Sequence, residues 1–463
     1  MLSSIVNMNS APRAGNTMAA SILQEHIKRI NKAAGNLSES LLDSGHPIDS
    51  LSGVSTRKLT DSRLETRAEV SRLALIDTCY ELLEHLTRPE DFLKFSIPIV
   101  SDQRSLSISS GLMKFKTIQF NSAMAVIVHF EFAGKVPEQG HISFEELAKR
   151  TQLHVEKVQR ILRCTVAYRV FCEEPLGYIS HTAISKCLLN PGLKAWLGHQ
   201  FEEMLPSSAK LIDAFEMYPG VDDDTETAFS VAFSGQQRTT YWEVLQKTPW
   251  KVKRFCDALE YIPTSGGAGD FRVLISCYDW KKLGGCKLVD VGGSTGRVSI
   301  AIAEIADPAM EFVIQDLPEV EAEALNTIPE PLSRRMVFRP HDFFKPQPTL
   351  DARVYMYRQI LHDWPDGKAV DILVALIPAL DPGDYLLLVE TVQPDPQTLP
   401  NSVERLIYAA DLLMMAKHNS KERTLGMWKD LLRRASPNFV LENVISPENS
   451  GAQGAIIEIR WWP

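Results

Sequence analysis

A histidine stands where a strand-like run ends. The apolar segment ARVYMYRQIL (352–361) is followed directly by His362, two acids and Trp364, in the stretch RQILHDWPD. An imidazole has an ordinary pKa of about 6.5, so it can accept or release a proton near neutral pH. A single histidine at the end of an apolar strand can equally be a packed or capping residue. Other motifs of the chain bear on this choice.

Three glycines follow another predicted strand. In LVDVGGSTGRV, Gly292, Gly293 and Gly296 lie between that strand and a predicted helix, where backbone can approach a ligand closely. A dinucleotide fingerprint needs glycine at 291, but Val291 stands there, and Asp316 ends the next strand where a carboxylate can accept ribose hydroxyls. The pattern predicts an adenosine ligand without phosphates, hence S-adenosylmethionine. The alternative is a structural turn, with Asp316 capping the next helix.

These motifs need a scaffold, and strands alternate with helices from about Lys287 onward. Such alternation predicts an α/β, doubly wound, mainly parallel sheet with ligands at the carboxyl ends of its strands. The last two strands can pair as an antiparallel edge hairpin. The predicted strands are 287–291, 311–317, 335–344, 352–361, 384–392, 439–446 and 454–462, and the predicted helices are 296–306, 318–326, 367–380, 403–418 and 424–435.

The N-terminal half has a different pattern. Residues 1–60 read as a mobile extension with a possible helix at 21–34, and the apolar spacing of 64–86 and 116–133 is helical. Residues 141–182 fit a winged helix, which in isolation suggests DNA binding. Acidic residues surround its helix and no basic stripe accompanies it, which disfavours nucleic acid as a partner. Residues 195–262 predict a helical bridge that the glycine-rich stretch 264–269 interrupts.

Composition excludes several classes of protein. The chain has 463 residues, 44% hydrophobic and 23% charged, and its formal net charge of −9 argues against nucleic acid as the main partner. The apolar runs are too short to span a bilayer, and no secretory leader is recognisable. Seven scattered cysteines without CxxC or Cys/His spacing predict reduced thiols, a cytoplasmic location and no metal site.

Five motifs occur in a fixed order: LVDVGGSTG, VIQDLPEV, HDFF, RQILHDWPD and NSKERTL. Together they resemble the caffeate-type class of O-methyltransferases, specifically the fungal members that modify secondary metabolites. The resemblance covers residues 64–463. It implies a Rossmann-like methyltransferase domain at 263–463 after a mostly helical, winged-helix dimerisation domain at 61–262. The implied protein is a homodimer that methylates a hydroxyl of a small aromatic or polyketide-like metabolite.

The resemblance also implies roles for individual residues. His362 would be the general base, with the carboxylates of Glu390 and Glu422 aiming the imidazole. The residues implied for the cofactor are Asp290, Gly292, Gly293, Asp316, Asp342, Phe343 and Arg358, where Arg358 replaces the lysine of plant members. The acceptor pocket would draw on Phe229, Phe233, Trp364 and Met414, whose large apolar surfaces suit a flat ligand.

A second enzymatic function stays open at this point. Some fungal relatives keep the fold and the bound cofactor but direct dehydration or a pericyclic reaction instead of methyl transfer. The presence of His362, Glu390 and Glu422 favours methylation, although a histidine base also serves a dehydratase. A winged-helix regulator with an inactive catalytic domain is the third interpretation.

Overall fold

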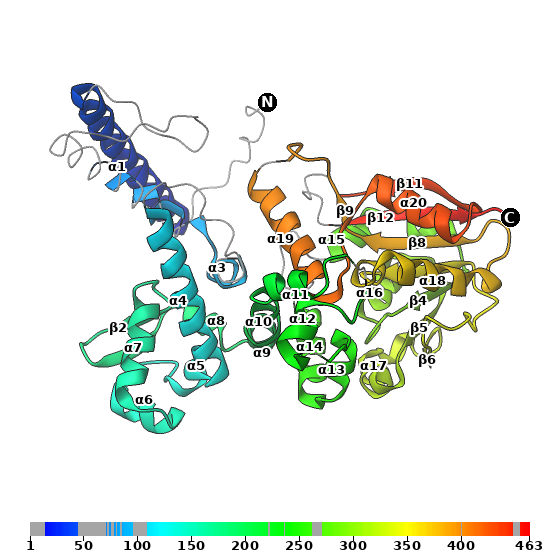
Figure 1. Cartoon of the computed structure of the whole chain (residues 1–463), viewed down its shortest axis with the longest axis horizontal. Coiled ribbons are helices and arrows are strands. Elements are labelled where there is room, and N and C mark those ends of the chain that lie inside the picture. Colours follow the sequence, from blue (N-terminus) through cyan, green and yellow to red (C-terminus); the bar gives the residue numbers. More distant parts are fainter. Residues whose placement is uncertain are drawn as a thin grey trace. The chain divides into compact units, whose positions relative to one another are not determined.

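A computed structural model describes residues 14–44, 71–95 without 72, 73, 76, 77, 80, 84 and 85, 109–220, 223–235, 237–261, 271–399, 401–447 and 454–463 (Figure 1). The described residues form two compact units. One draws on Met1–Ser122, Cys164–Cys172 and His181–Cys187, and the other on Ala123–Arg163, Glu173–Ser180 and Leu188–Pro463. The glycine-rich stretch 264–269 and the predicted boundary at 262–263 lie outside the described residues, so the division into domains stays a prediction.

The second unit contains a seven-stranded sheet of order β11-β12-β8-β7-β4-β5-β6. Strands β8, β7, β4, β5 and β6 run parallel, and β12 and β11 continue the sheet antiparallel. The bounds are β4 Lys287–Val291, β5 Glu311–Asp316, β6 Met336–Pro340, β7 Val354–Arg358, β8 Tyr385–Glu390, β11 Phe439–Ile445 and β12 Ala455–Trp461. The predicted fold class, including the antiparallel edge hairpin, is therefore confirmed.

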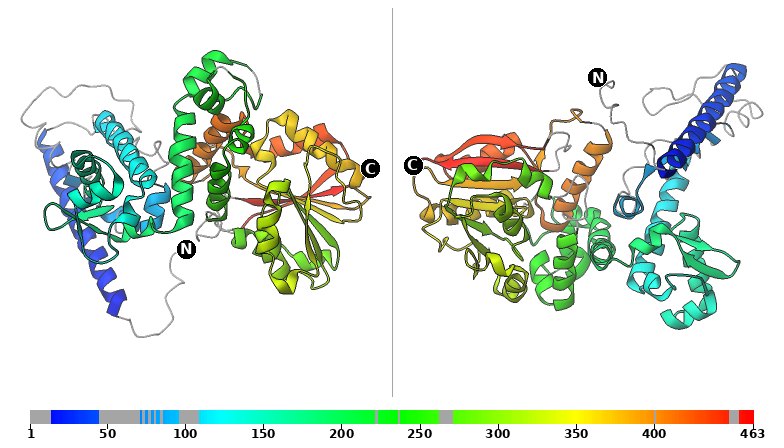
Figure 2. Two further views of the ribbon diagram at one scale, coloured as in Figure 1. Left: turned by 90° about the horizontal axis from the view of Figure 1, so that it is seen from below. Right: turned by 180° about the vertical axis from the view of Figure 1, so that it is seen from behind.

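Helices cover both faces of this sheet (Figure 2). Val289 and Val291 pack with α18 (Asp366–Leu376) and α20 (Leu425–Ala435), whereas Leu288 packs with α15 (Phe271–Ser276), α16 (Arg297–Ile305) and α17 (Glu321–Thr327). Successive residues of a strand point to opposite faces, so a strand buried on both sides is apolar throughout. This explains the continuous apolar runs of the sequence.

Strands β6 and β7 end four and three residues before the predicted ends at 344 and 361. Strand β6 ends at Pro340, and β7 ends at Arg358 because Gln359 has φ 51°, outside the extended region. The predicted helices 318–326 and 367–380 are each divided between an α-helix and a 3₁₀ turn. The early end of β7 matters for the site, since it frees the next residues to turn across the strand ends.

Helices α9 to α14 lie between the winged-helix region and the sheet in the chain, and α9 packs along α14. A π-helical turn at Gln200–Met204 follows α9. The bounds are α9 Pro191–His199, α10 Leu205–Ser208, α11 Leu211–Met217, α12 Ala228–Ser234, α13 Tyr241–Gln246 and α14 Pro249–Tyr261, with α19 at Asn401–His418. Phe229 and Tyr241 are central to a buried aromatic cluster in this region. This cluster borders the site described below.

The winged-helix elements occur at the predicted places. They are β1 Ile142–Ser143, α6 Phe144–Thr151, α7 Val155–Val166, β2 Phe171–Glu173 and β3 Tyr178–His181. Arg163 on α7 forms two hydrogen bonds, of 2.9 and 2.8 Å, with the carboxylate of Glu173. This basic side chain of α7, the helix that would face DNA in a DNA-binding winged helix, is thus neutralised within the protein.

The remaining helices are α1 Ala14–Ser44, α3 Pro89–Phe95, α4 Ser109–His129, α5 Phe132–Lys135 and α8 Ala183–Cys187. Helix α1 is longer than the patch at 21–34 from which a helix was predicted. Residues 1–13, 45–60 and much of the predicted helix 64–86 lie outside the described residues. Among the described helices, none combines the length and apolar character that crossing a membrane requires.

Candidate active site

The loop after β7 is anchored by Glu390 at the end of β8. Oε1 of Glu390 accepts hydrogen bonds from the backbone N–H groups of Ile360 and Leu361, at 3.0 and 2.9 Å. The positive φ of Gln359 turns these two successive amides toward the same oxygen. Glu390 thereby determines where the following histidine stands.

His362 lies in the 3₁₀ turn Leu361–Asp363 and is held by Glu422. Nδ1 of His362 is 3.0 Å from Oε1 of Glu422, and both side chains are largely buried. Glu422 is itself oriented, because its backbone N–H donates to Oδ1 of Asp411 at 2.8 Å. A carboxylate can only accept, so in a neutral His362 the proton lies on Nδ1. Nε2 then carries a free lone pair that can take a proton.

The two predicted carboxylates therefore hold different groups. Glu422 contacts the imidazole, whereas Glu390 binds the backbone of the loop, and its second oxygen, Oε2, is buried without a hydrogen-bond partner among the described residues. Burial raises the pKa of Glu390 to about 7, against the opposing effect of the His362 charge. Both acids are close enough to influence the histidine, but only one is bonded to it.

Asp363 adds a carboxylate that the sequence analysis did not single out. Its Oδ1 is 3.7 Å from Nε2 of His362 and 3.2 Å from Nε2 of His418 on α19. Burial by itself would lower the pKa of His362, but the charges of Asp363, Glu390 and Glu422 outweigh it and raise that pKa to about 10. The site thus favours the imidazolium, which is the product of taking up a proton.

Arg423 ties this arrangement together and was also missed from the sequence. It is completely buried, and its guanidinium donates to the carbonyls of Leu361 and Trp364 at 2.7 and 2.9 Å and to Oδ1 of Asp366. A planar fork of donors suits such a bonding pattern better than an ammonium does. The available signal was its position next to Glu422 in the motif NSKERTL.

The glycine loop between β4 and α16 is tightly packed. Gly292 has φ +71°, and a Cβ there would lie 2.4 Å from Cδ1 of Ile360, while a Cβ on Gly293 would lie 2.7 Å from the carboxyl carbon of Asp290. Gly296, at φ +78°, begins α16 as its N-cap. A side chain at 292 or 293 would therefore collide with Ile360 or Asp290, which explains why glycine stands at both positions.

Two acids flank this loop, the partly exposed Asp316 and the buried Asp290. Asp316 ends β5, where Oδ2 accepts from the N–H of Ser294 at 2.8 Å and Oδ1 from the N–H of Leu317 at 2.7 Å. Each oxygen keeps a lone pair for a further donor. Asp290 accepts a 2.6 Å hydrogen bond from the hydroxyl of Ser299, and burial raises its pKa to about 6.

The other predicted cofactor residues lie at differing depths. The Phe343 ring is 3.8 Å from the place a Cβ on Gly292 would take, so it borders the glycine loop. Asp342 is exposed and accepts from the N–H of Phe344 at 3.0 Å. The Arg358 guanidinium lies over the ring of Phe271, at 5.7 Å, and burial lowers its pKa against the opposing charges of Asp290 and Glu390.

The predicted pocket residues are mostly buried aromatics. Phe229 and Phe233 lie 4.6 Å apart, centroid to centroid, and Phe229 meets Tyr241 edge-on at 5.0 Å. Trp364 joins this cluster through Trp242, which stacks on it at 6.4 Å. Met414 on α19 is buried too. The aromatic cluster thus extends from α12 to Trp364 in the loop after β7.

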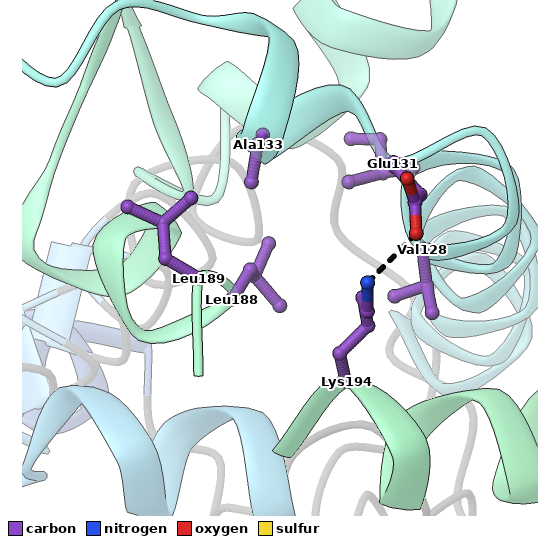
Figure 3. A pocket seen from close by; sticks show the side chains of 8 residues that line it. Val128, Glu131, Ala133, Leu188, Leu189 and Lys194 are labelled. Atoms are coloured by element: carbon purple, nitrogen blue, oxygen red, sulfur yellow. Dashed lines mark hydrogen bonds and ion pairs between the residues drawn. The ribbon is translucent and has the colours of Figure 1, made fainter. Parts of the chain in front are cut away.

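One cavity in the described residues is remote from this chemistry. It has a volume of about 90 Å³ and is lined by Ile127, Val128, Glu131, Ala133, Gly134, Leu188, Leu189 and Lys194. Figure 3 shows Leu188 and Leu189 across it from the 2.7 Å ion pair of Lys194 with Glu131. It contains none of the residues of the candidate site and is smaller than the roughly 300 Å³ of a typical ligand pocket.

Known proteins resemble this chain in sequence. A family model described as an O-methyltransferase domain matches residues 223–436. O-methyltransferase kk1A of Curvularia clavata is 36% identical over 354 residues, which are 76% of this chain and 82% of that protein. O-methyltransferase VdtC of Byssochlamys spectabilis is 30% identical over 446 residues, 94% of this chain and 97% of that protein.

Solved structures share the fold. One described as "A Pericyclic Reaction enzyme" has a TM-score of 0.67 and 25% sequence identity, and the match covers 85% of this chain and 100% of the other. The same scaffold is thus found in a protein whose description names a reaction other than methyl transfer.

Proposed function

The chain belongs to the family of S-adenosylmethionine-dependent O-methyltransferases, and we propose that it methylates a hydroxyl of a small aromatic or polyketide-like metabolite with His362 as general base. The observation that carries this proposal is the buried hydrogen bond of 3.0 Å between Nδ1 of His362 and Glu422. It leaves Nε2 as the proton acceptor. A neutral phenol, with a pKa of about 10, is a poor nucleophile until a base takes its proton.

The carboxylates stabilise the positive charge that forms on His362 during the reaction. Proton uptake makes His362 an imidazolium, and Glu422, Glu390 and Asp363 stabilise that cation. The same negative charges raise the pKa of His362 above that of a free imidazole. S-adenosylmethionine carries a positive charge, and a positive charge near His362 would lower the pKa of its imidazole toward neutral pH.

The residues present fit the cofactor. Glycines follow β4 at the start of a helix, where backbone N–H groups can approach a ligand, and Asp316 retains lone pairs suited to ribose hydroxyls. Phe343 borders the same loop and offers a flat apolar surface for an adenine. When bound, S-adenosylmethionine supplies a methyl group made electrophilic by the sulfonium. We assign Asp290, Asp342 and Arg358 to the same ligand on the basis of the motif resemblance.

The aromatic cluster around Phe229, Phe233 and Trp364, with Met414 beside it, supports a flat acceptor. The alternative is a non-methylating member that uses the bound cofactor to direct dehydration or a pericyclic reaction. The similarity to a structure described as a pericyclic reaction enzyme supports this alternative. A homodimer formed through the N-terminal helices and a cytoplasmic location stay predictions, and sedimentation at micromolar concentration would test the first.

Mass spectrometry of the purified protein with methyl-labelled S-adenosylmethionine and a panel of phenolic and polyketide precursors separates the two functions. A labelled acceptor formed together with an equal amount of S-adenosylhomocysteine is the expected result. Dehydration or isomerisation of an acceptor only in the presence of the cofactor, without S-adenosylhomocysteine, would contradict methyl transfer and favour the alternative.

A further inference from the structure

Lys417 is a buried cation that the proposed mechanism does not use. It lies on α19 and is 5% exposed. Its ammonium is 4.0 Å from the ring centroid of Tyr241, 5.1 Å from that of Phe255 and 5.6 Å from that of Trp242. Within the described part of the chain, no carboxylate lies within the 4.0 Å of an ion pair with it. A buried ammonium with aromatic faces as its neighbours is costly unless something else compensates its charge.

The rings around Lys417 carry further unused polar groups. The hydroxyl of Tyr241 and Nε1 of Trp242 are buried, and neither has a hydrogen-bond partner among the described residues. Tyr241 itself is fully buried. Buried polar groups in native proteins are nearly always paired, so two orphaned groups beside a buried cation indicate an absent partner. An ammonium and an indole N–H can only donate, and the tyrosine hydroxyl can donate as well. Each of the three groups can be satisfied by an acceptor oxygen.

This group of donors borders the catalytic loop. Trp242 stacks on Trp364 at 6.4 Å and on His418 at 5.5 Å, and Nε2 of His418 is 3.2 Å from Oδ1 of Asp363, the neighbour of His362. Burial lowers the pKa of Lys417, while the negative charges of Asp363 and Glu203 oppose that change. The lysine is therefore electrostatically linked to the loop without being bonded to it.

We propose that Lys417, with the Tyr241 hydroxyl and Trp242 Nε1, binds a second oxygen of the acceptor, a carboxylate conjugated to the aromatic ring that bears the hydroxyl. The inference rests on the proposed function, since it specifies the substrate of the same site. A carboxylate neutralises the buried ammonium and satisfies the orphaned donors together, which a phenol lacking a second oxygen cannot do. The aromatic cage then holds the ring while the carboxylate determines its orientation.

Binding measurements test this independently of turnover. Isothermal titration of the full chain, in the presence of S-adenosylhomocysteine, compares 1-hydroxy-2-naphthoate with 1-naphthol, which lacks the carboxylate. We expect the naphthoate to bind roughly tenfold to a hundredfold more tightly, as a charge-assisted hydrogen bond in a buried site allows. In Lys417→Met, whose thioether suits an aromatic surrounding, the naphthoate should lose this advantage while 1-naphthol keeps its Kd.

Two further variants complete the experiment. Lys417→Arg keeps the charge and should retain a preference for the naphthoate, and Lys429→Met makes the same chemical change at an exposed position of α20, where we expect wild-type behaviour. Equal affinity of the wild type for both ligands, no binding of the naphthoate, or an unchanged preference in a folded Lys417→Met would each overturn the inference. A clear preference without any methyl transfer in the labelling experiment would instead retain the binding site and reject the proposed function.

Discussion

Oε1 of Glu422 lies 3.0 Å from Nδ1 of His362, although the two residues are 60 positions apart in the chain. The contact forms because a short parallel pairing aligns the segment after β8 with the segment around Glu422. In it, β9 (Val392–Gln393) pairs with β10 (Arg423–Thr424), Val392 opposite Arg423. The same pairing leaves Nε2 as the free nitrogen of the histidine. The orientation of the proposed base thus depends on a two-residue strand pairing.

His362→Ala should remove methyl transfer without removing cofactor binding. A positioned general base contributes about a hundredfold to ten-thousandfold, so kcat should fall by that range. The Kd for S-adenosylhomocysteine, measured by isothermal titration, should stay at the wild-type value because the glycine loop and Asp316 are unchanged. His141→Ala, at an exposed position, serves as control. Turnover close to that of the control would remove the assignment of His362 as base.

Glu422→Gln should shift the pH dependence of kcat. The negative charge of Glu422 is one of those that raise the pKa of His362, so its removal lowers that pKa. Only the neutral imidazole accepts a proton, and hence the acidic limb of the profile should move to lower pH. The plateau should fall, because the imidazolium loses a stabilising charge. An acidic limb at the same pH in both proteins would show that it reports another group. Glu442→Gln makes the same change at an exposed strand position.

Arg423→Lys should lower both stability and activity. The ammonium cannot reproduce the fork that joins the carbonyls of Leu361 and Trp364 to Asp366, and buried acceptors are left without partners. We expect a loss of about 2–4 kcal/mol in the free energy of unfolding by urea denaturation, together with a reduced kcat. Arg433→Lys, on an exposed side chain of α20, should change neither quantity. If Arg423→Lys matched Arg433→Lys, the loop would have to be held by Glu390 without help from the arginine.

Gly292→Ala should weaken cofactor binding and destabilise the loop. Gly292 has φ +71°, and the added methyl would meet Cδ1 of Ile360 at 2.4 Å, so either the loop or the residue after Gln359 must move. The Kd for S-adenosylhomocysteine should rise at least about tenfold, because the shifted backbone no longer fits the ligand. Gly367→Ala is the matched control, since nothing lies within 4 Å of its Cβ position near the start of α18. There the free energy of unfolding should be unchanged or higher by up to about 1 kcal/mol. Equal ligand affinities in the two variants would exclude the glycine loop from the cofactor site.

The local pattern of the sequence was sufficient for the scaffold, whereas the roles of most candidate residues came from the resemblance of the motifs. Apolar runs alternating with amphipathic helices require a doubly wound sheet. Parallel strands present their carboxyl ends at one edge, so the glycine loop, Asp316, His362 and Glu390 follow strands that end together. Periodicity and strand ends are local properties, so they can be recognised from neighbouring residues in the amino-acid sequence.

Only the tertiary structure decided which groups touch. It bonded Glu422 to the imidazole and Glu390 to the two backbone amides. It also placed Asp363 between the Nε2 atoms of His362 and His418, at 3.7 and 3.2 Å, and bonded Arg423 to the carbonyl of Leu361. It also enclosed Lys417 in aromatic rings contributed by two other helices, α13 and α14. These contacts join segments up to 176 residues apart, as Lys417 and Tyr241 show. Over such separations, packing and burial in three dimensions determine which donor meets which acceptor. The spacing of residues along the chain does not specify these pairs.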